Sequence, residues 1–233
     1  MTLKTKPHRR NEPSLRRQSW QKYGHWLYAL ILPLYLAGFF IEEYFIDGSA
    51  PYMVSYMPMD DRIPFSEWWY IFYVLWYPFL GGVGLYLAFR DPRGFKRYMT
   101  YIGISFFTAL GLFALFPNGQ DLRPDLAALG RENIFTRLIG LLYASDTNTN
   151  VCPSLHVVGS MAAVFAIFHN DRLRRTRWLP IAGCMLACLI SVSTVTLTQP
   201  SLLDVLVAIP YAMLLYRLIY WTGNGNSMPT NTP

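Results

Sequence analysis

Residues 98–116 read YMTYIGISFFTALGLFALF, an apolar stretch that contains no charged side chain. An α-helix needs about 20 such residues to cross the hydrocarbon core of a bilayer. The stretch therefore predicts a transmembrane helix. The composition of the whole chain agrees, because 53% of its 233 residues are apolar and 15% are charged, whereas soluble domains carry about 25% charged residues. This balance excludes a disordered tail and argues against a soluble enzyme.

Further apolar stretches lie on both sides of residues 98–116, and together they predict an all-α integral membrane bundle of six transmembrane helices. The other five are residues 24–46, with a kink at Pro33, and residues 68–89, 153–168, 178–197 and 203–221. The stretch at 153–168 is short, so it could also be a half-span or a helix buried in protein. Between the third and fourth stretches, residues 134–143 (IFTRLIGLLY) predict a short interfacial helix.

The distribution of charge predicts the orientation of the bundle. If the N-terminus is cytoplasmic, 15 Lys and Arg residues fall in the cytoplasmic segments 1–25, 90–97 and 169–177. Only four fall in the outer segments 42–67 and 117–155. This asymmetry follows the positive-inside rule and places both termini in the cytoplasm.

Three regions follow from this topology: a basic cytoplasmic segment 1–25, a membrane domain 26–221 and a polar tail 222–233. The basic segment is typical of a membrane-surface anchor. A nucleic-acid partner is not expected, because no recognition motif accompanies the basic residues. The expected localisation is the cell membrane, with several crossings.

The three cysteines, Cys152, Cys184 and Cys188, do not predict a disulfide framework. Cys184 and Cys188 lie one helical turn apart in an apolar stretch. A metal pair would need two further ligands, and none lies nearby in the sequence. We therefore expect Cys184 and Cys188 to pack in the core, and we expect no metal.

Three polar patches interrupt the apolar pattern, and the topology places all of them on the outer side. They are residues 117–124 (PNGQDLRP), 152–156 (CPSLH) and 193–204 (STVTLTQPSLLD). The first directly follows the third apolar stretch, the second opens the fourth, and the third joins the fifth to the sixth. We expect them to meet at one boundary between membrane and water.

The residue types in these patches favour an anion site. Arg123 is a permanent cation whose planar fork suits phosphate oxygens. The helix that begins near Ser154 directs its first N–H groups to the same boundary, and His156 can exchange a proton near neutral pH. An unpaired carboxylate such as Asp204 is costly in an apolar helix and needs a partner.

Each of these residues also has an ordinary structural explanation when it is taken alone. His156 could simply meet solvent, Arg123 could snorkel at the end of a span, and Asp204 could cap the last helix. Their common side and their order along the chain favour the anion site.

The same residues resemble the three signature motifs of the type 2 phosphatidic acid phosphatase superfamily, a group of six-span membrane enzymes. The resemblance covers roughly residues 60–220. Arg123 with Pro124 matches the end of the first motif, and residues 153–156 (PSLH) match the second. Ser193 and Asp204 are in register with the third. The PSLH form, and Thr194 where other members have Arg, are similar to the branch of inositol phosphorylceramide synthases and their bacterial relatives.

The resemblance implies a lipid phosphate phosphatase or phosphotransferase that acts at the extracytoplasmic face without metal or cofactor. Its substrate would be a lipid phosphate or a phosphodiester lipid. Arg123 and Ser154 would bind the phosphate, and His156 would protonate the departing alcohol. Asp204 would orient a second histidine, which attacks phosphorus to give a phosphohistidine intermediate.

The chain departs from this pattern at the nucleophile. The attacking histidine should stand four residues before Asp204, where the chain has Pro200. The other histidines, His8, His25 and His169, map to the inner side, and the Lys of the first motif falls on Phe116. Activity is therefore expected to be low or lost, while the fold should survive because proline is tolerated at the start of a helix.

Alternative functions follow from the missing nucleophile. The chain could be a non-catalytic membrane protein that binds anionic lipid headgroups or a partner, which Pro200 favours. It could also hydrolyse phosphate slowly by direct attack of water, with help from His156 or Asp204. A small transporter is less well supported, because broken helices in matched halves are not evident.

Overall fold

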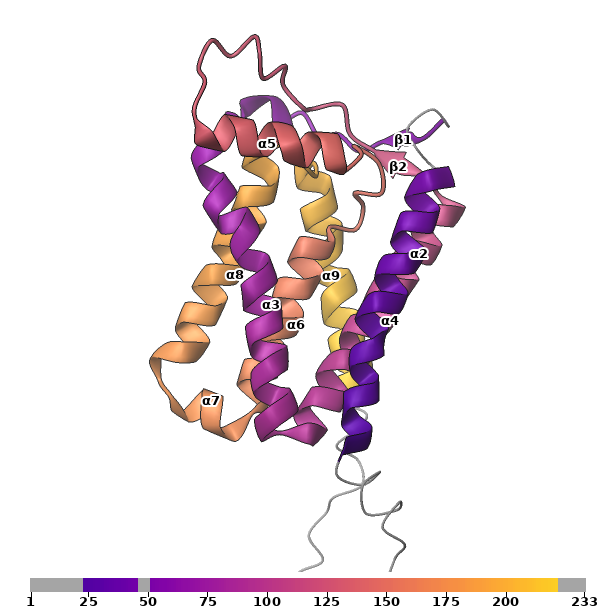
Figure 1. Ribbon diagram of the computed structural model, residues 1–233, viewed down its shortest axis with the longest axis vertical. Helices are drawn as coiled ribbons and strands as arrows, with labels where there is room; N and C mark the ends of the chain where they lie inside the picture. Colours follow the sequence, from indigo (N-terminus) through magenta and orange to yellow (C-terminus); the bar gives the residue numbers. More distant parts are fainter. Residues whose placement is uncertain (1–22, 46–50, 222–233) are drawn as a thin grey trace, which may run out of the picture.

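The computed structural model describes residues 23–45 and 51–221, which form a bundle of helices running between two ends (Figure 1). The residues of the basic segment before Tyr23, and the polar tail 222–233, lie outside the described residues. The elements that run along the bundle are η1 (Gly24–Leu30), α2 (Ile31–Phe45), α3 (Tyr70–Arg90), α4 (Pro92–Leu115), α6 (Leu155–His169), α8 (Trp178–Thr196), α9 (Leu202–Tyr216) and the π-helical turn η4 (Arg217–Trp221).

Short elements cover one end of this bundle. They are β1 (Met53–Val54), η2 (Asp60–Arg62), η3 (Glu67–Trp69), β2 (Asn118–Gly119) and α5 (Ile134–Ser145). The two strands pair in parallel, and α5 lies across the ends of the long helices (Figure 1). Asn133 caps α5 in a capping box with Thr136, so a helix is present where residues 134–143 predicted one.

Five helices are long and apolar enough to cross a membrane, as judged by length and composition. They are Gly24–Glu42, Glu67–Arg90, Pro92–Leu115, Trp178–Thr196 and Leu202–Trp221. Large apolar side chains are exposed on their sides; Leu34 is 62% exposed and Leu115 is 73% exposed. So much exposed apolar surface is typical of contact with lipid. The chain is therefore a helical, multi-pass membrane protein.

The remaining predicted transmembrane helix, α6, is the fourth along the chain. It has 15 residues and is shorter than the other five. At a rise of 1.5 Å per residue, it is roughly 22 Å long, less than the ~30 Å of a hydrocarbon core. It packs against α3, α4, α8 and α9, and its small residues Gly159, Ala162, Ala163 and Ala166 are buried. Small side chains allow helices to approach closely. Of the alternatives that the sequence left open, α6 matches a helix buried in protein.

Two helix starts differ from the sequence-based expectation. Asp91 caps α4 by accepting a hydrogen bond from the Gly94 N–H at 2.9 Å, and Pro92 takes the first helical position. The helix therefore begins at Pro92 and not at residue 98, because cap and proline are already in place. Pro33 lies in the first turn of α2, next to the change from 3₁₀ to α winding at Ile31.

The prediction that Cys184 and Cys188 pack in the core is wrong, because both are exposed. The buried positions of α8 include Gly183, Ile190 and Ser193, so the two cysteines lie on its exposed face. The described residues contain no cluster of His, Cys, Asp or Glu that could hold a metal ion.

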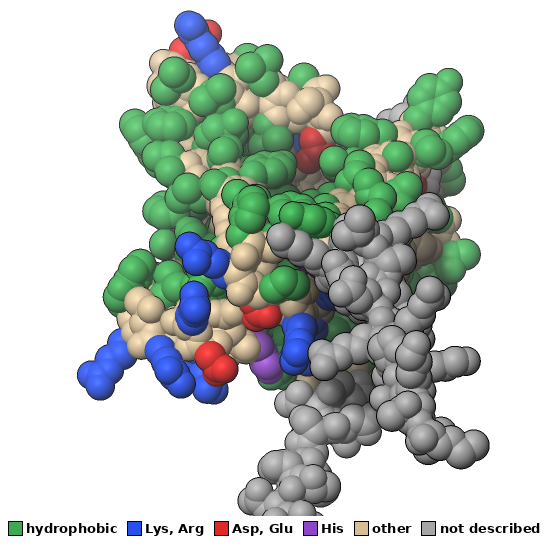
Figure 2. Space-filling view, turned by 60° about the horizontal axis from the view of Figure 1, so that its bottom comes forward, with side chains coloured by type: hydrophobic (Ala, Val, Ile, Leu, Met, Phe, Trp, Pro, Cys, Tyr) green, Lys and Arg blue, Asp and Glu red, His purple; other side chains and the backbone are tan. Residues whose placement is uncertain are grey.

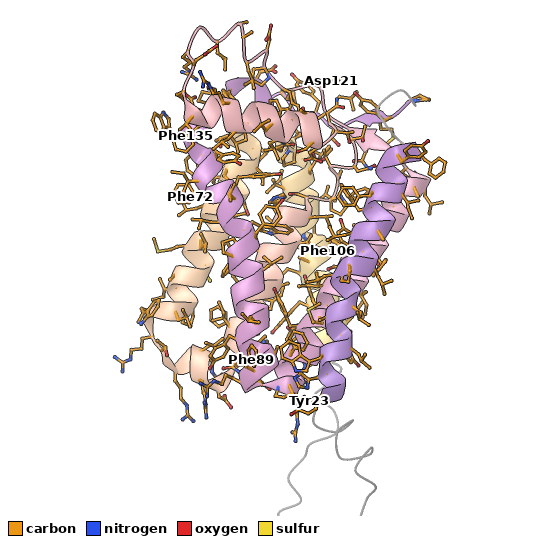
Figure 3. All side chains as sticks on the ribbon, in the orientation of Figure 1. Tyr23, Phe72, Phe89, Phe106, Asp121 and Phe135 are labelled. Atoms are coloured by element: carbon orange, nitrogen blue, oxygen red, sulfur yellow. The ribbon has the colours of Figure 1, made fainter. Side chains whose placement is uncertain are left out.

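The two ends of the bundle differ in charge. Lys and Arg side chains gather at the end that carries α7 (Asp171–Arg175), as Figure 2 shows. Tyr23 and Phe89 lie at that end, and Asp121 lies at the other (Figure 3). We call these the basic end and the α5 end. The three polar patches of the sequence belong to the α5 end.

Replacing Gly159 in α6 with Ala is expected to destabilise the bundle. A Cβ atom at Gly159 would lie 2.9 Å from the Trp76 ring and 3.0 Å from Leu80, so α3 would have to shift at a cost of about 1–3 kcal/mol. The matched control is Gly111→Ala in α4, where a Cβ meets no atom within 4 Å. Thermal unfolding in detergent should show a lower midpoint for Gly159→Ala alone. Equal midpoints for the two variants would contradict this packing.

Candidate functional site: a cavity at the start of α6

Side-chain hydrogen bonds join the three polar patches at the α5 end. Asn118 Oδ1 accepts hydrogen bonds from the N–H groups of Val151 (3.0 Å) and Cys152 (2.8 Å). Gln120 Nε2 donates to the Thr198 carbonyl at 2.7 Å. Segments that are far apart in the sequence therefore lie side by side, and the buried Asn118 and Gln120 side chains hold them there.

A cavity of about 300 Å³ lies where α6 begins. Aromatic side chains from α2 and α3 form one wall: Tyr35, Phe39, Phe40, Tyr73, Trp76 and Tyr77. Polar side chains complete the lining, among them Thr147, Asn150, Ser154, His156 and Gln199. The lining thus combines aromatic and polar side chains, and the volume is within the range of ligand sites, which starts at about 300 Å³.

His156 lines this cavity, and its ring is fixed by two aromatic neighbours. The ring centroids of Tyr73 and Trp76 each lie 4.4 Å from the centroid of His156. The Nε2 atom of His156 is buried and has no hydrogen-bond partner in the described part of the chain. An imidazole held in this way can exchange a proton with a bound molecule.

Ser154 also lines the cavity and is the N-cap residue of α6. Its backbone N–H donates to the Asp204 carbonyl at 3.3 Å, while its side chain makes no capping hydrogen bond. The first N–H groups of a helix have no partner within the helix, and they favour an anion. The start of α6 therefore offers donors next to His156.

Arg123 lies behind the cavity wall rather than in it. Its guanidinium donates to the carbonyls of Asp146 (2.8 Å) and Thr147 (2.7 Å) and to Gln199 Oε1 (2.8 Å). It also lies 4.6 Å from the ring centroid of Tyr143. These contacts hold the outer loop and Gln199 in place.

Gln199 and Asn150 are cavity residues to which the sequence assigned no role. Because Gln199 Oε1 accepts from Arg123, its Nε2 is directed elsewhere; this atom is buried and has no partner within the described residues. The side chain of Asn150, at a positive φ of 60°, likewise has no partner there for Oδ1 or Nδ2. Leaving a buried polar group unpaired costs about 1–3 kcal/mol, so both side chains favour a polar guest.

Asp204 is fully buried and caps α9, which is the structural alternative that the sequence left open. Its Oδ2 accepts a hydrogen bond from the Ser201 N–H at 2.7 Å in a capping box. Asp60, which sequence reasoning missed, accepts from the Ser201 hydroxyl at 2.6 Å and from the Leu202 N–H at 2.9 Å. Two carboxylates thus lie at the positive end of the α9 dipole.

Pro200 lines the same cavity as Ser154 and His156. It precedes the N-cap residue Ser201, so it lies before the helix and not at its first position. A proline there removes no hydrogen bond from α9. Of the five predicted site residues, Ser154, His156 and Pro200 line the cavity, and Arg123 and Asp204 support its wall.

Cys152 should react slowly with alkylating agents. Burial, and then the nearby Asp204 carboxylate, raise the pKa of this thiol to about 12, whereas an ordinary thiol has a pKa of about 8.5 and reacts as the thiolate. In a Cys184→Ser, Cys188→Ser background, the rate of iodoacetamide labelling against pH should show no inflection below pH 10. Asp204→Asn should lower the pKa and speed labelling, because a negative charge is removed.

Asp125→Asn, which changes an exposed carboxylate of the outer loop, is the control and should label like the parent. An inflection near pH 8.5 in the parent protein would show that Cys152 is not buried against Asp204.

The arrangement offers hydrogen bonds to an oxygen-rich group. Gln199 Nε2 and the start of α6 supply donors, and His156 supplies the titratable nitrogen. The cavity lacks a side-chain nucleophile at position 200. No family model matches this chain, and no curated protein and no solved structure matches it either.

Proposed function

We propose that this chain is a membrane protein of the type 2 phosphatidic acid phosphatase kind. Its cavity binds the phosphate-bearing headgroup of a lipid, and its phosphatase or phosphotransferase turnover is very low because position 200 has no nucleophile. One observation carries this proposal: Ser154, His156 and position 200, the family's phosphate-contacting, acid and nucleophile positions, line a single cavity.

The mixed aromatic and polar lining of the cavity supports a lipid rather than a soluble phosphate ester. Phe39 and Tyr77, on the aromatic wall, belong to helices long and apolar enough to span a membrane. A lipid could place its headgroup against Gln199 and His156 and the beginning of its chains along this wall. An amphiphile contacts both the aromatic and the polar side chains, whereas a small polar ester contacts only the polar ones.

The chemistry at the phosphorus would divide among the cavity residues. The N–H groups at the start of α6 and Gln199 Nε2 stabilise the phosphoryl oxygens, and His156 protonates the departing alcohol oxygen. The Pro200 ring offers no lone pair to phosphorus. Asp204 has no histidine to orient and caps α9 instead. Only attack by water remains, so we expect turnover to be very low.

The same proposal includes the orientation in the membrane. The basic end, which carries α7, is cytoplasmic under the positive-inside rule. Both termini then lie in the cytoplasm, and the cavity opens at the extracytoplasmic face. In this arrangement α6 is the fourth of six crossings, and its short length is tolerated because protein surrounds it.

Replacing Pro200 with His is expected to raise phosphate release from lipid phosphates. Loss of a nucleophile costs about 10⁶-fold in another hydrolase, so a partly restored site should gain at least about 100-fold. The assay measures phosphate released from a panel of lipid phosphates in detergent micelles. Position 200 lies outside α9, so the variant should fold normally.

The control is the double variant Pro200→His, His156→Ala, which should lose the gain because the departing alcohol receives no proton. If Pro200→His folds and releases no more phosphate than the parent, the assignment of a catalytic site to this cavity is wrong.

The second candidate is a non-catalytic protein that binds anionic lipid headgroups, and Pro200 favours it. Binding then depends on Gln199. Gln199→Glu retains an acceptor for Arg123 but replaces the donor Nε2 with a carboxylate oxygen. Binding of dihexanoyl phosphatidic acid, measured by calorimetry in detergent, should weaken at least about tenfold through loss of a charge-assisted hydrogen bond and added repulsion.

Asp125→Asn provides a matched change of charge on the exposed outer loop and should bind as the parent does. Unchanged affinity in Gln199→Glu would contradict headgroup binding in this cavity. Binding without phosphate release in every variant, including Pro200→His, would favour the non-catalytic function.

A further inference from the structure

A second cavity, of about 120 Å³, lies at the basic end of the bundle. It is bordered by the start of α4, the end of α6 and the turn η4. Its polar lining consists of Asp91, Arg93, Arg97, His169, Asn170 and Tyr220. None of these residues lines the cavity at the start of α6, so the two sites are separate.

The Tyr220 hydroxyl is the first sign of a ligand. Tyr220 belongs to the π-helical turn η4 and is 3% exposed. Its hydroxyl is buried and has no hydrogen-bond partner among residues 23–45 and 51–221. Single π-helical turns occur often at functional sites, and a buried hydroxyl without a partner costs about 1–3 kcal/mol. A guest oxygen in the cavity would supply the missing partner.

The charged groups around Tyr220 favour an anion. The Arg97 guanidinium carbon lies 5.5 Å from the centroid of the Tyr220 ring, and Arg93 is a second permanent cation among the lining residues. The His169 ring packs against Tyr220 with centroids 4.6 Å apart. Arginine is the side chain best suited to phosphate oxygens because its planar fork can donate two parallel hydrogen bonds.

Asp91 is the acidic residue of this lining, and its oxygens already have partners. Oδ1 accepts from the Gly94 N–H and Oδ2 from Asn170 Nδ2, each at 2.9 Å. His169 Nδ1 lies 2.9 Å from the Phe165 carbonyl. Arg93 and Arg97 together carry two positive charges against the one negative charge of Asp91, so the lining has a net positive charge. Both Asp91 oxygens already accept hydrogen bonds.

We propose that this cavity binds a phosphate group at the basic end of the bundle. A water molecule occupies about 30 Å³ of the liquid, so the cavity has room for one tetrahedral oxyanion but not for the glycerol and chains of a lipid. The phosphate could be free or could project from a lipid headgroup at the adjacent membrane surface. Arg97 and the Tyr220 hydroxyl are its principal contacts.

The experiment uses the full chain in detergent with two probes. Calorimetry measures inorganic phosphate, and native mass spectrometry compares retention of dioleoyl phosphatidic acid with that of dioleoyl phosphatidylcholine. The test variants are Arg97→Ala and Tyr220→Phe, which removes only the hydroxyl. The controls are Arg217→Ala and Tyr216→Phe, neighbouring residues that do not line the cavity.

Each test variant should weaken binding of at least one phosphate probe about tenfold, because a charge-assisted hydrogen bond is lost, while both controls bind as the parent does. Loss confined to phosphatidic acid would identify a lipid headgroup as the ligand, and loss confined to inorganic phosphate would identify the free anion. If Arg97→Ala and Tyr220→Phe bind both probes like the parent, the proposal is overturned.

Discussion

The structure depends on the position of one short helix. With 15 residues, α6 covers less than the thickness of a hydrocarbon core, and it begins below the ends of α3 and α8 (Figure 1). Backbone groups at such a depth must find partners inside the protein. The loop before α6 finds them in Asn118, which holds the N–H groups of Val151 and Cys152, and in the Asp204 carbonyl, which holds Ser154 N–H. The cavity is the space left above this recessed start.

The recessed start also determines the chemistry proposed for the site. Donors at a helix N-terminus are more effective when water is excluded, because electrostatic interactions strengthen in a low dielectric. The Arg123 guanidinium does not line the cavity. It donates a hydrogen bond to Gln199 Oε1, so the Nε2 atom of the same amide is directed inward. The proposed site can bind a phosphate group and still turn it over slowly, because binding and nucleophilic attack use different residues and position 200 provides no nucleophile.

Much of this fold follows from the sequence. Five apolar stretches, the helix at α5 and the juxtaposition of the polar patches can be predicted from hydropathy and the charge distribution. The orientation of Cys184 and Cys188 could not be predicted, because apolar residues of a membrane helix face lipid and protein alike. Nor could the roles of Asn118 and Gln199, since nothing local distinguishes a buried amide that joins distant loops from one in an ordinary turn. The sequence left open whether Asp204 caps the apolar helix in which it lies. The structure decides this, because Asp204 accepts from the Ser201 N–H and the Ser201 hydroxyl donates to Asp60.

The most direct test is an experimental structure of the full chain in a lipid nanodisc with a non-hydrolysable phosphonate analogue of phosphatidic acid. The account predicts the phosphonate between His156, Ser154 and Gln199 at the start of α6, with Arg123 behind Gln199 and the chains of the analogue along Phe39 and Tyr77. A map in which His156 and Gln199 face different parts of the bundle, or in which the analogue lies away from the start of α6, would contradict it.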